Sequence, residues 1–225
     1  MSASALMAAS FWEALAAPDA AALEARGMRR SFARGHAICH AGQVADRVLV
    51  LLAGRVKVTA PSASGREIVL AFHVPGELVG ELAALDGGTR SASMVALEPV
   101  DVLALAPDEF RAFLDDHPAA ALALVRTLGR RLRDADVRLM EFATVDTLCR
   151  VDIRLVELCD RFGEPEGDHI DVALPLSQEE LAGWACASLE SVARALQTMR
   201  SLGWIETRRR AIRVLDIAAV RRAAG

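Results

Sequence analysis

Residues 75–92 read PGELVGELAALDGGTRSA, a glycine-rich turn that carries a carboxylate and is followed by an arginine and a serine. Exposed backbone N–H groups at such a turn, together with a nearby arginine, form a pocket for an anion. A carboxylate beside a phosphate is unfavourable unless it binds a sugar hydroxyl, so the combination predicts a site for a ribose with a singly charged phosphate. The residues of this candidate site are Gly80, Glu81, Leu82, Ala83, Arg90 and Ser91.

The sequence around this stretch is typical of a small β domain. Residues 36–107 are rich in Val, Leu and Ala, with glycines at short intervals. The run Val48–Val58 alternates in part around Gly54, and Glu67–Phe72 has the composition of another short strand. Short strands with glycine turns predict a compact β-barrel or roll, and glycine spacing alone also fits a generic β domain.

From Pro118 onward the pattern is helical. Apolar residues follow a 3-4 spacing over nearly three heptads, and the positions beside them are mostly charged. A narrow apolar stripe is typical of a helix that pairs with a second copy, whereas a helix packed on its own domain usually has a wider stripe. We therefore expect a homodimer, with packing on its own domain as the alternative. The seam residues are Val125, Leu128, Leu132, Ala135, Leu139 and Phe142.

The last third of the chain begins with a helix and a loop. Val151–Phe162 is amphipathic, and Gly163–Asp168 is polar and acidic with a proline, which predicts a loop. Ser177 followed by Glu180 is a capping-box signature for a short helix over residues 178–185.

A second helix and a hairpin follow after a tight turn. The helix opens near Ser188 and runs to about Leu202, with Gly203 as its C-terminal cap. Trp204–Glu206 and Ile212–Leu215 are strand-like and predict a β-hairpin wing. The order of elements therefore predicts a winged helix-turn-helix.

The charge of this region is polarised, although the whole chain has a formal net charge of only −4. Residues 146–188 hold three arginines against ten acidic residues, whereas residues 189–225 hold eight against three. Because duplex DNA is a dense line of phosphate charge, its partner needs a basic face rather than a basic overall composition. We therefore expect double-stranded DNA to bind at the second helix and at Arg208, Arg209 and Arg210. A solvated turn is the alternative for these three arginines.

The first turns of the second helix present Leu189, Glu190, Ala193 and Arg194. The N-terminal residues of a recognition helix reach base edges in the major groove. Arg194 is suited to bidentate hydrogen bonds with guanine, and Glu190 to the cytosine amino group. The alternative is an exposed i, i+4 ion pair, which is compatible with DNA reading because it orients Arg194.

Other function classes have little support in the sequence. No apolar run reaches the roughly 18–20 residues that span a bilayer, and the first residues lack a signal-peptide pattern, so we expect a cytoplasmic protein with no membrane partner. The histidines are scattered and no nucleophile–base pair stands out, which argues against an enzyme. His36 and His40 lie in a predicted strand, so no metal site is expected. The four cysteines are expected to be buried small hydrophobes: Cys39, Cys149, Cys159 and Cys186.

Over nearly its full length the chain resembles the cyclic-AMP receptor protein / fumarate-nitrate reductase regulator (CRP/FNR) family of bacterial transcription factors. The segments that carry the resemblance are Val50–Val58, Gly80–Ser91, Arg130–Leu132, Ser177–Leu181 and Ser188–Arg194. It implies an α+β fold with a jelly-roll-like, cyclic-nucleotide-binding β-roll over residues 1–117. A dimerisation helix with a hinge follows over 118–145, and a winged helix-turn-helix over 146–225.

The resemblance assigns roles around the phosphate. Glu81 would bind the ribose 2′-hydroxyl, and Arg90 and Ser91 would bind the cyclic phosphate. Gly80 and Leu82 would shape the turn, and the Leu82–Ala83 backbone would face the ligand.

The purine end departs from the family pattern. Where the cyclic-AMP sensor of enteric bacteria has a Thr–Ser pair on the long helix, this chain has Ala135 and Asp136. The Ala135 side chain offers no hydrogen bond, whereas Asp136 can accept one from an adenine amino group or from guanine. The implied effector is cyclic AMP or cyclic GMP, with a vestigial pocket and a solvated Asp136 as alternatives.

The resemblance also places Ser177 and Ser188, with the recognition helix, on DNA. Leu189 replaces the first arginine of the Arg–Glu…Arg pattern of cyclic-AMP-type readers, whereas Glu190 and Arg194 are retained. This implies a palindromic site with a TGA-like half-site core, next to which one guanine is no longer read. RNA polymerase is a further implied partner.

The implied function is a dimeric, sequence-specific DNA-binding transcriptional regulator under allosteric control by a cyclic nucleotide. The ligand would bridge the roll to the long helices of both subunits and change the hinge near Thr144–Asp146. One alternative is a nucleotide-independent regulator of the same fold, whose roll serves dimerisation or protein contacts. Another is a nucleotide-binding module whose main partner is a protein.

Overall fold

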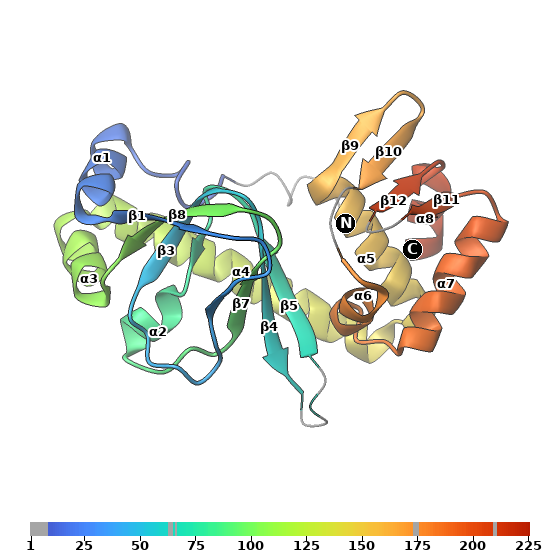
Figure 1. Cartoon of the computed structure of the whole chain (residues 1–225), viewed down its shortest axis with the longest axis horizontal. Coiled ribbons are helices and arrows are strands. Elements are labelled where there is room, and N and C mark those ends of the chain that lie inside the picture. The colour runs from blue at the N-terminus through green and yellow to red at the C-terminus, as the bar shows by residue number, and fades with distance from the viewer. Residues whose placement is uncertain (1–8, 63–64, 66, 173–175, 209–210) are drawn as a thin grey trace. The chain divides into compact units, whose positions relative to one another are not determined.

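A computed structural model describes residues 9–225, with the exception of 63–64, 66, 173–175 and 209–210. The described residues form two compact units, one made of residues 9–60 and 70–134 and the other of 61–69 and 135–225. Strands and helices of the first unit build a β-roll, and the second unit contains the helix-turn-helix (Figure 1). The domain boundaries proposed at residues 117 and 145 stay predictions.

The predicted β-roll is confirmed. Its described strands form two four-stranded sheets, in the orders β1-β8-β3-β6 and β2-β7-β4-β5. The strands are β1 (Met28–Phe32), β2 (Ala37–Cys39), β3 (Val48–Ala53), β4 (Val56–Pro61), β5 (Glu67–His73), β6 (Leu78–Val79), β7 (Ser93–Ala96) and β8 (Val100–Leu105).

Strand β3 shows why this region is so apolar. Successive side chains of a strand point to opposite faces of its sheet. Leu49 and Leu51 are buried in the core of the roll, whereas Val48 and Val50 are buried against the helices on the outer face. A strand covered on both faces therefore reads as an unbroken apolar run.

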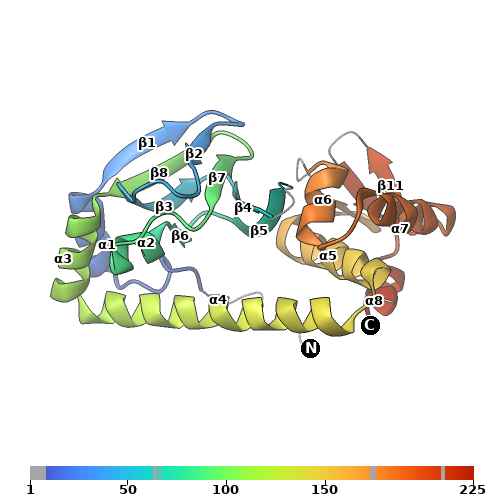
Figure 2. The ribbon, with the colours of Figure 1, turned by 90° about the horizontal axis from the view of Figure 1, so that it is seen from below.

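Four helices accompany the roll: α1 (Ala17–Arg26), α2 (Glu81–Asp86), α3 (Pro107–Asp116) and the 27-residue α4 (Pro118–Thr144). The first turns of α4 lie along the roll (Figure 2), where Ala120, Ala123 and Leu124 join the same core as Phe110 and Phe113. No helix among the described residues is both long and apolar enough to cross a membrane.

The second unit contains the predicted winged helix-turn-helix. Its described strands form one sheet in the order β11-β12-β10-β9. Its elements are α5 (Thr147–Phe162), β9 (Gly163–Glu166), β10 (His169–Val172), α6 (Gln178–Trp184), α7 (Leu189–Ser201), β11 (Ile205–Arg208), β12 (Ala211–Val214) and α8 (Ile217–Ala224).

The loop prediction for residues 163–168 is wrong. The segment is strand β9 and the turn of a hairpin, with Gly167 at a φ of 61° in the turn. Strand β10 pairs with β12 on its other side, so the hairpin extends an existing sheet. Nη2 of Arg213, on β12, lies 3.4 Å from the Glu166 carboxylate of β9, so part of the acidic charge that made the segment resemble a loop has a counter-charge in the sheet.

The expectation of four buried cysteines is wrong for one of them. Cys39 and Cys159 are buried and Cys149 is half-buried, but Cys186 is exposed. Cys186 has a φ of 47° in the turn between α6 and α7. A non-glycine residue in this left-handed conformation is uncommon, and here it reverses the chain between the two helices.

Candidate functional site

A small cavity lies in the roll where β6 leads into α2. Its volume is about 120 Å³. Its polar lining residues are His73, Glu81, Arg90, Ser91 and Arg131, and the others are Val58, Val79, Gly80, Leu82, Ala83, Ala92 and Met94. All six residues predicted from the glycine–glutamate–arginine stretch therefore meet at one pocket.

Gly80 makes the turn at the pocket possible. It has a φ of 80°, a backbone conformation that residues other than glycine rarely adopt. A Cβ atom at this position would lie 2.2 Å from Nη1 of Arg90. Glycine is therefore required for both the backbone conformation and the close approach of the arginine.

Arg90 is a buried cation whose hydrogen bonds are only partly satisfied. It is 4% exposed, and its Nη1 donates to the Gly80 carbonyl at 2.9 Å. Its Nη2 donates to the Arg47 carbonyl at 2.5 Å and lies 3.4 Å from the exposed carboxylate of Asp46. Its Nε finds no hydrogen-bond partner among the residues that the structure describes. A buried charge with an unused donor is costly unless an anion completes it.

Glu81 also lines the cavity, and it is held by a residue that the sequence interpretation did not assign to the pocket. The Glu81 side chain is buried, and its Oε1 accepts a hydrogen bond from Nη1 of Arg131 at 2.7 Å. Nη2 of Arg131 donates to the Leu78 carbonyl at 2.5 Å. Arg131 belongs to α4, so the long helix contributes directly to the wall of the pocket.

The two residues predicted to meet the base do not line this cavity. Ala135 and Asp136 follow Arg131 on α4, are exposed, and fall in the other compact unit. Their role at the base stays a prediction. His73, at the end of β5, lines the cavity although it lies outside the glycine–glutamate–arginine stretch. The only sequence signal for it was a histidine four residues before Glu77.

The recognition helix has the expected boundaries and caps. Ser177 and Glu180 form both hydrogen bonds of the capping box that opens α6, and the Ser188 side chain accepts from the Ser191 N–H at the start of α7. One face of α7 is buried through Val192, Ala195, Leu196 and Met199. Leu189, Glu190, Ala193 and Arg194 lie on the exposed face.

Arg194 and Glu190 form the i, i+4 pair that the sequence suggested. Nη2 of Arg194 donates to Oε1 of Glu190 at 3.0 Å, with the side chains 61% and 83% exposed. A pair this exposed contributes little to stability. The pair holds the guanidinium of Arg194 in one orientation on the solvent-exposed face of α7.

The wing adds positive charge beside the helix. Arg208 is exposed, whereas Arg209 and Arg210 lie outside the described residues. Arg200, which the sequence interpretation did not single out, donates to Thr207 of β11 at 3.1 Å and lines an open hollow with Arg208. Arg200 lies in the last turn of α7, directly before the wing, and this position in the sequence could have indicated a basic residue near DNA.

Comparisons with known proteins agree with this geometry. Residues 29–117 match the cyclic nucleotide-binding domain family, and residues 150–223 match the Crp-like helix-turn-helix domain family. The chain is 33% identical over 185 residues to the CRP-like cAMP-activated global transcriptional regulator of Mycobacterium tuberculosis, which covers 82% of this chain and 83% of that protein.

The chain belongs to the CRP/FNR family of transcriptional regulators. It is also 33% identical to the cyclic AMP receptor protein of Thermus thermophilus over 78% of each chain. Among solved structures, a CRP-family transcriptional regulator of Thermus thermophilus matches with a TM-score of 0.75 and 30% identity, covering 87% of this chain and 96% of that one. These relatives are transcriptional regulators rather than enzymes.

The long helix of this CRP/FNR regulator carries an exposed apolar stripe. Leu132 is 64% exposed and Leu139 66%, and Val125, Ala135 and Phe142 are also exposed. Leu128 differs, since it is half-buried and packs against the core of its own roll. The stripe is available for a second copy, and the assignment of all six residues to a dimer interface stays a prediction.

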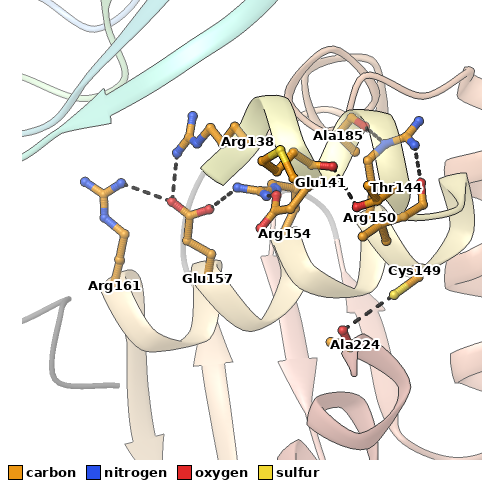
Figure 3. A network of polar contacts seen from close by, with 12 residues as sticks. Arg138, Glu141, Thr144, Cys149, Arg150, Arg154, Glu157, Arg161, Ala185 and Ala224 are labelled. Atoms are coloured by element: carbon orange, nitrogen blue, oxygen red, sulfur yellow. Dashed lines mark hydrogen bonds and ion pairs between the residues drawn. The ribbon is translucent and has the colours of Figure 1, made fainter. Parts of the chain in front are cut away.

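The end of α4 is tied to the helix-turn-helix by two buried arginines of α5, as Figure 3 shows. Arg150 donates to the Val145 carbonyl at 2.7 Å, just after α4. It also donates to the Ala185 carbonyl at 3.0 Å, just after α6. Arg154 donates to Glu157 at 2.5 Å and also pairs with Glu141 of α4. Side-chain hydrogen bonds and an ion pair of α5 therefore hold the predicted hinge region near residues 144–146 against the helix-turn-helix; these contacts are called the cross-brace.

Proposed function

We propose that this CRP/FNR regulator is controlled by a cyclic nucleotide that binds in the roll. The observation that carries the proposal is Arg90, a buried guanidinium that lines the cavity and whose Nε–H has no partner among the described residues. One cation matches the single negative charge of a cyclic phosphodiester. The names of two relatives, a cAMP-activated regulator and a cyclic AMP receptor protein, support the same ligand class.

The other pocket residues fit the rest of the ligand. Glu81 would accept a hydrogen bond from the ribose 2′-hydroxyl, and Ser91 would donate to the phosphate. Because Glu81 is paired with Arg131 of α4, a ligand that binds Glu81 would change a contact of the long helix. Ligand binding shifts an equilibrium only through such differential contacts.

The regulator would act on DNA as a homodimer. The exposed stripe of α4 would pair with its counterpart, and the two α7 helices would enter successive major grooves, which lie about 34 Å apart. Arg194 would read guanine in each TGA-like half-site of a palindrome. Arg150 and Arg154 would transmit a change in α4 to α6 and α7. RNA polymerase is the further partner we expect, and a cytoplasmic location follows from this function.

Calorimetric titration of the purified protein tests the effector. We expect cyclic AMP or cyclic GMP to bind with measurable heat, to raise the melting temperature, and to increase affinity for palindromic DNA. Arg90→Met removes the guanidinium at similar volume and is expected to weaken binding by about 100-fold or more. Absence of heat and of thermal stabilisation with both nucleotides, with unchanged DNA affinity, would favour the nucleotide-independent alternative.

A further inference from the structure

The cavity has one polar side chain that the ribose and phosphate do not account for. Arg90 and Ser91 lie at the predicted phosphate end, and Glu81 is paired with Arg131. Apart from these residues and the α2 turn, the lining is apolar except for His73. A purine that enters this cavity therefore meets His73 as the remaining hydrogen-bonding side chain of the lining.

Glu77 fixes the orientation and the tautomer of this histidine. Nδ1 of His73 lies 2.5 Å from Oε2 of Glu77, and the His73 side chain is 12% exposed. Because a carboxylate only accepts hydrogen bonds, Nδ1 carries the proton. In the neutral ring Nε2 is then an acceptor.

The surroundings favour the neutral ring. Burial lowers the pKa of His73, and the nearby Arg131 lowers it further, while Glu77 and Glu81 act in the opposite direction. The net direction is downward, so at neutral pH the imidazole offers an acceptor and not a second donor.

We propose that His73 determines base specificity, its Nε2 accepting a hydrogen bond from the exocyclic amino group of the effector's purine. The inference rests on the proposed nucleotide function and assigns base reading to the roll itself, independently of Ala135 and Asp136 on α4. Glu77 is a positioning residue, since it acts only by holding the ring. The alternative is that His73 merely ties the end of β5 to the Glu77 turn.

Paired nucleotides that differ by one amino group separate these two roles. The full-length protein is titrated calorimetrically with cyclic AMP and with cyclic purine riboside monophosphate, which lacks the 6-amino group. A second pair is cyclic GMP and cyclic IMP, which lacks the 2-amino group. In the pair whose amino group His73 reads, we expect its loss to weaken binding roughly three- to tenfold, as for one neutral hydrogen bond.

Variants then test whether the His73 side chain causes the difference in affinity between the two nucleotides of a pair. His73→Leu is expected to bind both members of the pair equally, whereas His73→Gln, which keeps an acceptor, retains part of the preference. Glu77→Gln no longer fixes the tautomer of His73, so we expect this variant to show a smaller preference for the nucleotide that carries the amino group. His40→Gln, at an exposed histidine outside the cavity, is the matched control and keeps the full preference.

The outcomes distinguish this inference from the proposed function. Equal binding of both members of each pair by the wild-type protein, or undiminished discrimination in His73→Leu, overturns the role of His73 and leaves nucleotide control intact. If the wild-type protein binds none of the four nucleotides, both proposals fail. If His73→Leu does not fold, the affinity ratio within each nucleotide pair is compared between the wild-type protein and His73→Gln. An unchanged ratio in His73→Gln then contradicts the role of His73.

Discussion

The buried carboxylate of Glu81 accepts a hydrogen bond from the guanidinium of Arg131 at 2.7 Å, which joins the α2 turn to the long helix. Fifty residues separate the two in sequence. The pair therefore places a candidate ligand-binding group and the helix that carries the apolar stripe in one contact.

Removing one partner of this pair is expected to destabilise the roll. Arg131→Ala leaves a buried carboxylate without its counter-charge and lowers the free energy of unfolding by about 1–3 kcal/mol. Adding Glu81→Gln recovers part of the loss. Urea denaturation measures both, with the exposed Arg133→Ala on the same helix as the control. Equal effects of the Arg131 and Arg133 substitutions would contradict the buried pair.

The exposed stripe of α4 is expected to hold a dimer. Leu132→Glu and Leu139→Glu place charges in the seam and raise the dimer dissociation constant by about 100-fold or more each. Sedimentation velocity over a range of concentrations measures the change. A wild-type protein that sediments as a monomer at every concentration, with or without nucleotide, would exclude the dimer.

Arg194 and Arg200 are expected to contribute to DNA binding in different ways. Arg194→Ala loses about 1–3 kcal/mol of discrimination at one base pair of each half-site. Arg200→Ala weakens binding to all sequences alike and reduces the salt dependence by about one counterion. Binding titrations over a set of single-base variants and salt concentrations separate the two. Identical profiles for the two variants would refute a reading role for Arg194.

The cross-brace at the end of α4 is expected to couple the two functions. Arg150→Leu removes the donors to the Val145 and Ala185 carbonyls. Nucleotide binding to the roll should persist, while its effect on DNA affinity falls about fivefold or more, the lower range of typical allosteric coupling. The DNA affinity with and without nucleotide measures this. Full retention of the nucleotide effect would show that coupling follows another route.

Asp152 is expected to make stability depend on pH. Burial, together with the negative charge of Asp146, raises the pKa of Asp152 to about 6. Since this pKa lies above that of the unfolded chain, the folded state favours the protonated acid, and stability decreases as pH rises through 6. Asp152→Asn should therefore raise the melting temperature at pH 7.5 and much less at pH 4.5. The exposed Glu164→Gln is the control, and a pH-independent effect of Asp152→Asn would contradict the assignment.

Local patterns were sufficient for much of the fold. A capping box, a glycine that must adopt a positive φ and a stripe of apolar residues each depend on neighbours within a few positions, so Ser177, Gly80 and α7 lie where the sequence predicted them. The same logic failed for β9. There, the hairpin is completed by β12, which pairs with β10 and whose Arg213, 47 residues from Glu166 in sequence, lies 3.4 Å from the Glu166 carboxylate, so the strand depends on a distant segment.

The sequence by itself determined which residues form the glycine–glutamate–arginine turn, the long helix and the recognition helix, because those signals are contiguous along the chain. Only the tertiary structure decided that Arg131 and His73 complete the cavity, that Arg90 is buried with a donor unused, and that Leu128 packs on its own roll. The physical reason is that burial and counter-charge are supplied by segments far apart in sequence, so they exist only once the chain has folded.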